Sequence, residues 1–455
     1  MSTVKCDSTL DDGQHLLAIA ALFNGEFSID CLVELLSEKK PSQIIFQLEK
    51  SVGEGILEKK TPGSYAFKDY KKQTKYLNLL PDQDKKILHG YIADILIRQL
   101  PDDEQKAYAV AHQLIHIAND VERCRFLIEA GDLHRRNFQT EDALQCYSKV
   151  LDDLSGLDGS EEDRLFSETA IKYSKISTAR HDTTKVLSIL ESALERAEKR
   201  DMKFHQALLK MHMAKNEWLR SRYNSAMKYF EEGWSLAHEV QDSRLMYMAT
   251  TFSTFFLFWQ GRFGEAIRIY EKSVPDIERY PQGGFPLLSV ITMGYCYAQI
   301  GQVTQGLGML DALRTHGLDK GDVYLTAYAE GNVGVILLNI GHVDEAIQFL
   351  EGAVKEAQEV HNDWVWISAQ ISLAYAYYVK GNKEQAMKCL QCFLQHSRKV
   401  QTTVYLHAYL LELCLAIKMK ELPPVEGLSL EKEIQGMIAG KNLLLKGVAH
   451  RYEAI

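Results

Sequence analysis

The sequence has few of the features that mark a secreted, membrane-spanning or disulfide-stabilised protein. Only nine of its 455 residues are proline, and no apolar run approaches the about 18 residues that a membrane span needs. The first residues, Met1 to Asp7, lack the apolar core of a signal peptide. Eight scattered cysteines then favour reduced thiols over a disulfide framework. We therefore expect a cytoplasmic protein with no membrane partner.

Neither the charge nor the motifs point to nucleic-acid coating or to catalysis. The 52 basic and 61 acidic residues give a net charge of −9, which argues against a broad surface for nucleic acid or anionic lipid. No Gly-x-x-x-x-Gly-Lys-Ser/Thr loop and no Gly-x-Ser-x-Gly elbow occurs. His112 and His116 have the spacing of a helical zinc site, but Gln113 replaces the glutamate of a metalloprotease. We predict a protein that is not an enzyme and has no cofactor.

A glycine hinge recurs at intervals of about 40 residues through more than half of the chain. A helix that ends at glycine, a short turn and a second helix that begins near a small residue allow two antiparallel helices to pack closely. Such pairs bury their apolar faces only by stacking, so the pattern predicts an α-solenoid. The hinges lie near His181, Ser221, Gly261, Gly301, Gly341 and Gly381, and the small residues are Ala226, Ala266, Gly306, Ala346 and Ala386.

The repeated unit resembles the tetratricopeptide repeat in a form lengthened to about 40 residues. A small residue stands in the first helix of each unit, as at Gly294 and Gly334, and an aromatic residue or leucine often follows, as at Tyr297 and Leu337. The resemblance covers residues 121 to about 400 and implies about six to eight repeats in a curved arm. The predicted fold class is therefore all-α.

Residues 1–80 have a different pattern, in which three short helices precede two strands around Pro62 and Gly63. This pattern predicts a winged-helix-like domain with a small β-hairpin, a fold that often binds DNA through its third helix. That helix, residues 42–51, has one lysine and no arginine, so few of its groups suit phosphates or bases. Nucleic acid is therefore not the expected partner, although one basic cluster follows the hairpin: Lys68, Lys71, Lys72 and Lys75.

The order of parts resembles the region downstream of the nucleotide-binding module in STAND-type regulatory ATPases, which include MalT-like transcription activators. The resemblance rests on the winged-helix pattern, on residues 76–81 and 88–93, and on residues 128–132. It implies a sensor region that binds a protein partner or small effector and works with a nucleotide-binding module outside this chain. Asp69-Tyr70 stands where the family often has His-Asp, which places that family contact in doubt.

The sequence predicts four segments: 1–80, 81–155 as a helical linker with the first helical pair, 156–401 as the repeat array, and 402–455 as degenerate helices. Pro423-Pro424 must interrupt a helix in the last segment. The terminal helix has no evident C-cap, which leaves open that the chain is part of a longer protein.

In proteins of the resembled type, the first helix of each repeat lines the concave face. The resemblance therefore implies a candidate partner-binding groove at Met211, Lys215, Trp218, Phe255, Phe258, Tyr295, Tyr328, Tyr375 and Tyr378. This lining is aromatic and apolar, with Lys215 almost its only charge. An open groove would suit an apolar peptide, a partner helix or a small ligand. In the alternative, the same side chains simply pack on neighbouring repeats.

Cys389, Cys392 and His396 share one face of a predicted helix and are weak candidates for a metal site. Cys-x-x-Cys zinc sites usually lie on a turn, and small thiols are common between stacked helices, so we predict no metal there. The predicted function is a regulatory or scaffold protein whose arm binds a protein partner or small effector in bacterial signalling or transcription control. The alternatives are a sensor fragment of a STAND ATPase and DNA binding through the winged helix.

Overall fold

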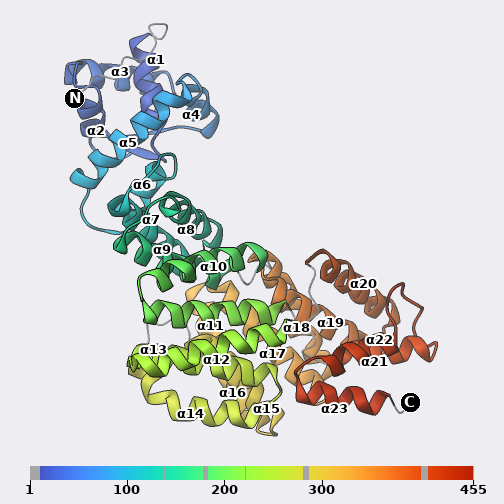
Figure 1. Cartoon of the computed structure of the whole chain (residues 1–455). Coiled ribbons are helices and arrows are strands. Elements are labelled where there is room, and N and C mark those ends of the chain that lie inside the picture. Colours follow the sequence, from blue (N-terminus) through green and yellow to red (C-terminus); the bar gives the residue numbers. More distant parts are fainter. Residues whose placement is uncertain are drawn as a thin grey trace. The chain divides into compact units, whose positions relative to one another are not determined.

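The computed structural model describes residues 11–137, 139–177, 183–220, 222–279, 286–400 and 408–453. The chain divides into two compact units, one up to Thr169 and one from Ala170 onward, and each is described by itself. The predicted hinges near His181 and Ser221 fall on or beside positions outside the described residues. Figure 1 shows the helices and strands along the chain.

The first unit begins with three helices and a small antiparallel sheet. The helices are α1 (Asp12–Ala20), α2 (Ile29–Leu35) and α3 (Pro41–Gly53), and the strands are β1 (Glu26–Ser28), β2 (Leu57–Lys59) and β3 (Ser64–Phe67). The strand order is β1-β3-β2, and Phe27 pairs with Tyr65 in the register. The predicted order of three helices and a hairpin is confirmed, but β1 was not predicted because three residues give no clear alternation. The assignment as a winged helix stays a prediction.

The remainder of the first unit is helical. It contains α4 (Tyr70–Leu77), α5 (Asp82–Gln99), α6 (Glu104–Leu114), α7 (Val121–Arg136), α8 (Thr140–Leu154) and the beginning of α9 (Ser160–Ser177). Helices α7 and α8 pack as a pair, and the ring of Tyr147 lies so close to Gly131 that a Cβ there would approach it to 2.6 Å. The Tyr147 hydroxyl donates to Asp132 at 2.6 Å, which satisfies its polar end.

The second unit is a stack of helical pairs, which confirms the predicted all-α solenoid of paired helices. Its elements are α10 (Thr183–Lys199), α11 (Lys203–Leu219), α12 (Tyr223–Val240), α13 (Ser243–Trp259), α14 (Phe263–Arg279), α15 (Pro286–Gln299), α16 (Val303–Lys320), α17 (Val323–Asn339), α18 (Val343–Glu359), α19 (Asp363–Val379) and α20 (Lys383–Val400). Each odd-numbered helix from α11 to α19 packs both on its even-numbered partner and on the next odd-numbered helix. The odd-numbered helices therefore form a continuous layer, which we call the odd-helix layer.

Residues with a left-handed backbone (positive φ) occur at two kinds of position in the stack. In the pairs from α13 to α20 the turn is made by a glycine with positive φ, as at Gly341, where φ is 86° and the amide of His342 donates to the carbonyl oxygen of Leu337 at 2.9 Å. Between pairs the chain again takes a positive φ, but three of these joints are not glycine: Asp201, Gln241 and His361. Sequence analysis found the first kind and missed the second, because only glycine signals a left-handed residue strongly.

The chain ends in three shorter helices, α21 (Tyr409–Lys418), α22 (Leu430–Ala439) and α23 (Leu443–Tyr452). Helix α21 packs on α19 and so continues the odd-helix layer, and α22 packs on α21 and on α23. Every cysteine in the described part of the chain has a free thiol. Within the described residues, no helix combines the length and apolar character that a membrane span requires.

The helices of one pair approach closely because both contact positions are glycine. A Cβ built on Gly306 of α16 would lie 2.3 Å from the carbonyl oxygen of Gly294 in α15. Two positions further along the same helix, a Cβ on Gly308 would meet nothing within 4 Å. Gly306 and Gly308 therefore have opposite roles, because Gly306 lies in the helix contact and Gly308 has no packing role.

These roles predict opposite effects of alanine. Gly306→Ala should lower the free energy of unfolding by about 1–3 kcal/mol, because the backbones of α15 and α16 must move apart. Gly308→Ala should raise it by about 0.5–1 kcal/mol through helix propensity. Urea unfolding followed by circular dichroism measures both, and a destabilising Gly308→Ala or a neutral Gly306→Ala would contradict the packing described.

Candidate ligand-binding face

The predicted groove residues fall into two groups in the structure. Met211, Trp218, Phe258 and Tyr295 are buried, whereas Lys215, Phe255, Tyr328, Tyr375 and Tyr378 are half-buried. The buried group packs between helices: the ring of Phe258 lies 5.5 Å from that of Tyr295, and that of Trp218 lies 5.4 Å from Phe256. In this structure, only the half-buried group is partly exposed to solvent.

A half-buried row of side chains crosses the odd-helix layer. The Lys215 Nζ atom of α11 lies 5.6 Å from the centre of the Phe255 ring of α13. The row continues from Phe255 to Trp259 at 6.1 Å and from Trp259 to Trp364 of α19 at 6.3 Å between ring centres. We call Lys215, Phe255, Trp259 and Trp364 the aromatic row. Sequence analysis included its first two members and missed both tryptophans.

The contact between Trp259 and Trp364 shows that the layer is curved. Helices α13 and α19 are separated within the layer by α15 and α17, which pack on each other in sequence. The two tryptophans can meet only if the layer bends so that its ends approach on one side. The aromatic row therefore lies on the concave side of the bend, where the resemblance to tetratricopeptide repeats placed the groove.

Lys215 is a cation without an anionic partner. Within the described part of the chain it makes no salt bridge, and its neighbour is the face of the Phe255 ring. Burial lowers its pKa from 10.5 to about 8, because few water molecules solvate the ammonium group. By contrast, Lys210 on the same helix is paired with Glu232 at 2.8 Å. Lys215 therefore offers an unsatisfied positive charge at one end of the aromatic row.

The other part of the concave face is covered by the end of the chain. Tyr375 stacks on Tyr409 of α21, with the ring centres 4.8 Å apart and the planes at 12°. The Tyr409 hydroxyl donates to Asn339 of α17 at 2.6 Å, and Tyr378 donates to Glu421. In this part of the face, the predicted groove residues pack against other parts of the protein, as the alternative prediction stated. Tyr328 lies apart from α21 in these contacts and pairs with the ring of Tyr324, 5.0 Å away.

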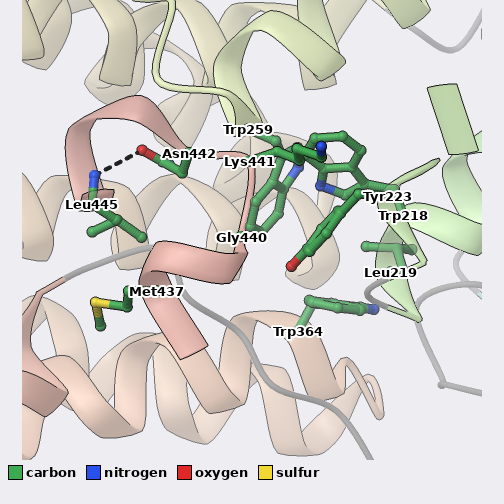
Figure 2. Close-up of a pocket in the computed structure, with 10 residues that line it drawn as sticks. All are labelled: Trp218, Leu219, Tyr223, Trp259, Trp364, Met437, Gly440, Lys441, Asn442 and Leu445. Carbon is green, nitrogen blue, oxygen red and sulfur yellow. Dashed lines mark hydrogen bonds between the residues drawn. The ribbon is translucent and has the colours of Figure 1, made fainter. Parts of the chain in front are cut away.

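A narrow cleft lies where the aromatic row meets the C-terminal helices. Its walls include three tryptophans of the repeats and the turn between α22 and α23, and in Figure 2 the rings of Trp218, Trp259 and Tyr223 lie together beside Lys441. The remaining cavity volume is about 30 Å³, enough for one or two water molecules. We call this the tryptophan cleft, and its lining residues are Trp218, Leu219, Tyr223, Trp259, Trp364, Met437, Gly440, Lys441, Asn442 and Leu445.

The weak metal candidates have other neighbours. His396 contacts Asp363 at 2.7 Å, and its ring lies 4.4 Å from that of Trp366 at a tilt of 50°, while Cys389 is buried and burial raises its pKa to about 11. No group of three or more His, Cys, Asp or Glu among the described residues is arranged to hold a metal ion. The metal hypothesis at Cys389, Cys392 and His396 therefore gains no support.

The two spaced histidines belong to a packed cluster. His116 stacks on His89 with ring centres 4.3 Å apart and meets His112 edge-on at 5.6 Å. His89 shares a 2.7 Å hydrogen bond with Gln113, and burial lowers its pKa to about 4. Neutral, mutually packed rings account for these residues without a ligand.

Two of the basic residues near α3 are paired with carboxylates. Lys59 pairs with Glu49 at 2.7 Å and Lys72 with Asp69 at 3.2 Å, while Phe46 of α3 is 67% exposed. A helix that reads DNA needs cations free to meet phosphates, and here an apolar ring occupies the exposed position. This surface suits protein contact better than nucleic acid.

Comparisons with known proteins agree on the fold. The sequence matches no protein-family model and no curated protein. In structure, the chain is similar to the Rap conjugation gene regulator of the plasmid pLS20 in complex with the Phr* peptide, with a TM-score of 0.52 and 14% identity over 86% of this chain and 96% of that one. It is also similar to a Rap protein complexed with Competence and Sporulation Factor, with a TM-score of 0.50 and 12% identity over 70% and 94% of the two chains.

A third similar structure is a STAND protein with a tetratricopeptide repeat sensor from Pyrococcus horikoshii. The TM-score is 0.49 with 14% identity over 98% of this chain, which spans 63% of that protein's length. At these identities the likeness establishes the fold alone. The chain is a tetratricopeptide-like helical-repeat protein with a small three-stranded antiparallel sheet near its N-terminus.

The lowered pKa of Lys215 predicts a specific dependence of stability on pH. Between about pH 8 and 10.5 the unfolded chain holds a proton on Lys215 that the folded chain has lost, so folding is favoured as pH rises through this window. Below pH 8 both states are protonated and the cost of burying the charge is fully present. Lys215→Met should therefore raise the free energy of unfolding at pH 7 by about 1–2 kcal/mol and remove this rise.

Urea unfolding at pH 7 and pH 9.5 measures the effect. The matched control is Lys210→Met on the same helix, which removes a paired lysine and should not stabilise the protein at pH 7. If Lys215→Met shows the same pH dependence as the unmodified protein, the ammonium group is solvated and the description of the aromatic row is wrong.

Proposed function

We propose that this protein is a non-catalytic regulatory protein whose tetratricopeptide-like arm binds a peptide, either free or as a segment of a protein partner, on its concave face. The observation that carries the proposal is the unpaired Lys215 at one end of the half-buried aromatic row. The ligand that fits this row carries a carboxylate for Lys215 and apolar side chains for Phe255 and the tryptophans.

The chemistry of the row favours such a ligand. A desolvated ammonium group gains more from a carboxylate than a solvated one, because the cost of its desolvation has already been met in the folded protein. Aromatic rings supply large contact areas with little loss of side-chain freedom, and they commonly dominate binding energy at interfaces. Together they favour a peptide with one acidic group beside aliphatic or aromatic residues.

The similar structures support the same class of ligand. Both Rap proteins were solved as complexes, one with the Phr* peptide and one with Competence and Sporulation Factor. The fold likeness and the aromatic row together lead us to infer a role in bacterial signalling or transcription control. A small effector with the same carboxylate and apolar groups would satisfy the row equally well.

The other predicted functions stay hypotheses. Cooperation with a nucleotide-binding module outside this chain rests on the sequence resemblance to STAND-type ATPases. DNA binding through the first unit is opposed by the exposed Phe46 on α3 and by the pairing of Lys59 and Lys72 with carboxylates.

Selection from a random peptide library on the full-length protein tests the proposal. We expect enrichment of peptides that combine an acidic group with apolar residues. Lys215→Glu and Phe255→Ala should each weaken the selected peptides at least about tenfold, measured by fluorescence anisotropy, because they reverse the charge or remove the ring.

The matched control for charge reversal is Lys355→Glu on α18, whose side chain is 79% exposed and lies outside the odd-helix layer. It should leave the affinity unchanged, and circular dichroism should show that all three variants are folded. The concave face would be excluded as the site if the library yielded no binder. It would also be excluded if Lys355→Glu and Lys215→Glu weakened the peptide affinity equally.

An electrophoretic mobility assay addresses the DNA alternative. We expect no shift of a random duplex even at low salt, where contacts between lysine and phosphate are strongest. A shift that weakens as salt increases would show that the first unit binds DNA.

A further inference from the structure

The turn between α22 and α23 is seated on the concave face of the arm. We call residues 440–445 the C-terminal turn. The main-chain amide of Leu443 donates to the carbonyl oxygen of Gln260, at the end of α13, with a length of 2.8 Å. Four residues of the turn, Gly440, Lys441, Asn442 and Leu445, line the tryptophan cleft together with Trp218, Trp259 and Trp364 (Figure 2).

At this point the repeats provide a hydrogen-bond acceptor for a main-chain amide. Gln260 follows the last turn of α13, where carbonyl groups have no partner within the helix and accept hydrogen bonds from elsewhere. The adjacent Gly261 has a φ of 72°, and a Cβ there would come within 2.8 Å of Asn442 Oδ1 and 3.1 Å of the Leu444 amide nitrogen. The absence of a side chain at Gly261 therefore lets the beginning of α23 approach closely.

The C-terminal turn contains both exposed and buried residues, and the buried ones are Asn442 and Leu445, of which Leu445 belongs to the hydrophobic core of the repeats. Leu443 is 60% exposed and Leu444 is 42% exposed, so two of its three leucines contribute little buried area. The side chain of Asn442 caps α23 by accepting from the Leu445 amide at 3.1 Å, a bond within the turn rather than to the arm. The turn is therefore held on the repeats by the hydrogen bond of the Leu443 amide, by the buried side chain of Leu445 and by contact with the cleft.

The turn and an external ligand cannot share the cleft. The cavity volume left between the turn and the tryptophans is about 30 Å³, which is too small for a peptide. A ligand that extends along the aromatic row from Lys215 past Trp259 enters the cleft that the turn already occupies. Binding along the whole row therefore requires the turn to leave.

We propose that residues 440–445 are an internal ligand of the tryptophan cleft, which they occupy until a peptide with a free main-chain amide and an aliphatic side chain displaces them. The proposal rests on the proposed function, because it places the end of the peptide site in this cleft. It also describes the ligand: an extended segment whose amide donates to Gln260 and whose apolar side chain meets Trp218, Trp259 and Trp364.

One substitution removes the hydrogen bond between the turn and α13 without unfolding the turn. Leu443 is the first residue of α23, a position that tolerates proline, and Asn442 before it has the extended backbone, φ −81° and ψ 113°, that a following proline requires. Leu443→Pro therefore deletes the amide that donates to Gln260 and preserves the helix. Leu443→Ala is the matched control, because it shortens the same exposed side chain and retains the amide.

The probe is a fluorescein-labelled synthetic peptide with the sequence of residues 440–452, added to the full-length protein. Leu443→Pro should bind it about 3- to 10-fold more tightly than the unmodified protein or Leu443→Ala, as expected for the loss of one competing hydrogen bond. Adding Trp259→Ala to Leu443→Pro should abolish the gain. A probe with proline in place of its own leucine at the same position should bind weakly to every variant.

Equal affinity in Leu443→Pro, Leu443→Ala and the unmodified protein would overturn the proposal, as would a gain that survives Trp259→Ala. The result is distinguishable from failure of the proposed function. If the affinity of the library peptides depends on Lys215 but does not change in Leu443→Pro, the proposed binding face is supported and the internal ligand is excluded. A probe that binds Leu443→Pro more tightly, with no library binder for any variant, would support the internal ligand and exclude the acidic peptide.

Discussion

The close approach of the two helices in each repeat is the constraint on which the rest of the second unit depends. Small residues at the crossing, with Gly306 against the backbone of Gly294 as the tightest case, set the distance between the helices of a pair. The left-handed glycines at the hinges from Gly261 to Gly381 then end the first helix of each pair and lead the chain into the second. Because the same geometry is repeated, the odd-numbered helices form one curved layer, and the curvature brings Trp259 to Trp364. The aromatic row is thus a product of scaffold geometry.

The composition of the concave face is the basis for the proposal that it binds a ligand. Phe258 and Tyr295 show how aromatic residues are used in this protein to fill space between repeats. Lys215 has no comparable structural role, since it is desolvated and faces a ring instead of a carboxylate. A cation in that position costs stability, and a ligand carboxylate would recover it.

Much of the fold could be predicted from the sequence because the repeat fixes local structure. The hinge glycines and the small residues of the second helices located the pairs. Strand β1 was not predicted because a run of three residues is too short to show alternation. The joints at Asp201, Gln241 and His361 were not predicted because these residue types do not signal a left-handed backbone.

The candidate site was predicted only in part because it depends on contacts between distant repeats. Lys215 and Phe255 follow from position within a repeat, but Trp259 and Trp364 meet only through the curvature of the whole layer. Likewise, the covering of Tyr375 by Tyr409 and the seating of residues 440–445 on α13 depend on how the degenerate C-terminal helices fold back. Neither contact leaves a local pattern in the sequence.

A crystal structure of the full-length protein with the tightest peptide selected on it tests the central claim most directly. The account predicts electron density along the aromatic row, with a carboxylate of the peptide within hydrogen-bond distance of Lys215 Nζ. A peptide bound on the even-numbered helices, or one bound without contact to Lys215, Phe255 or Trp259, would contradict it.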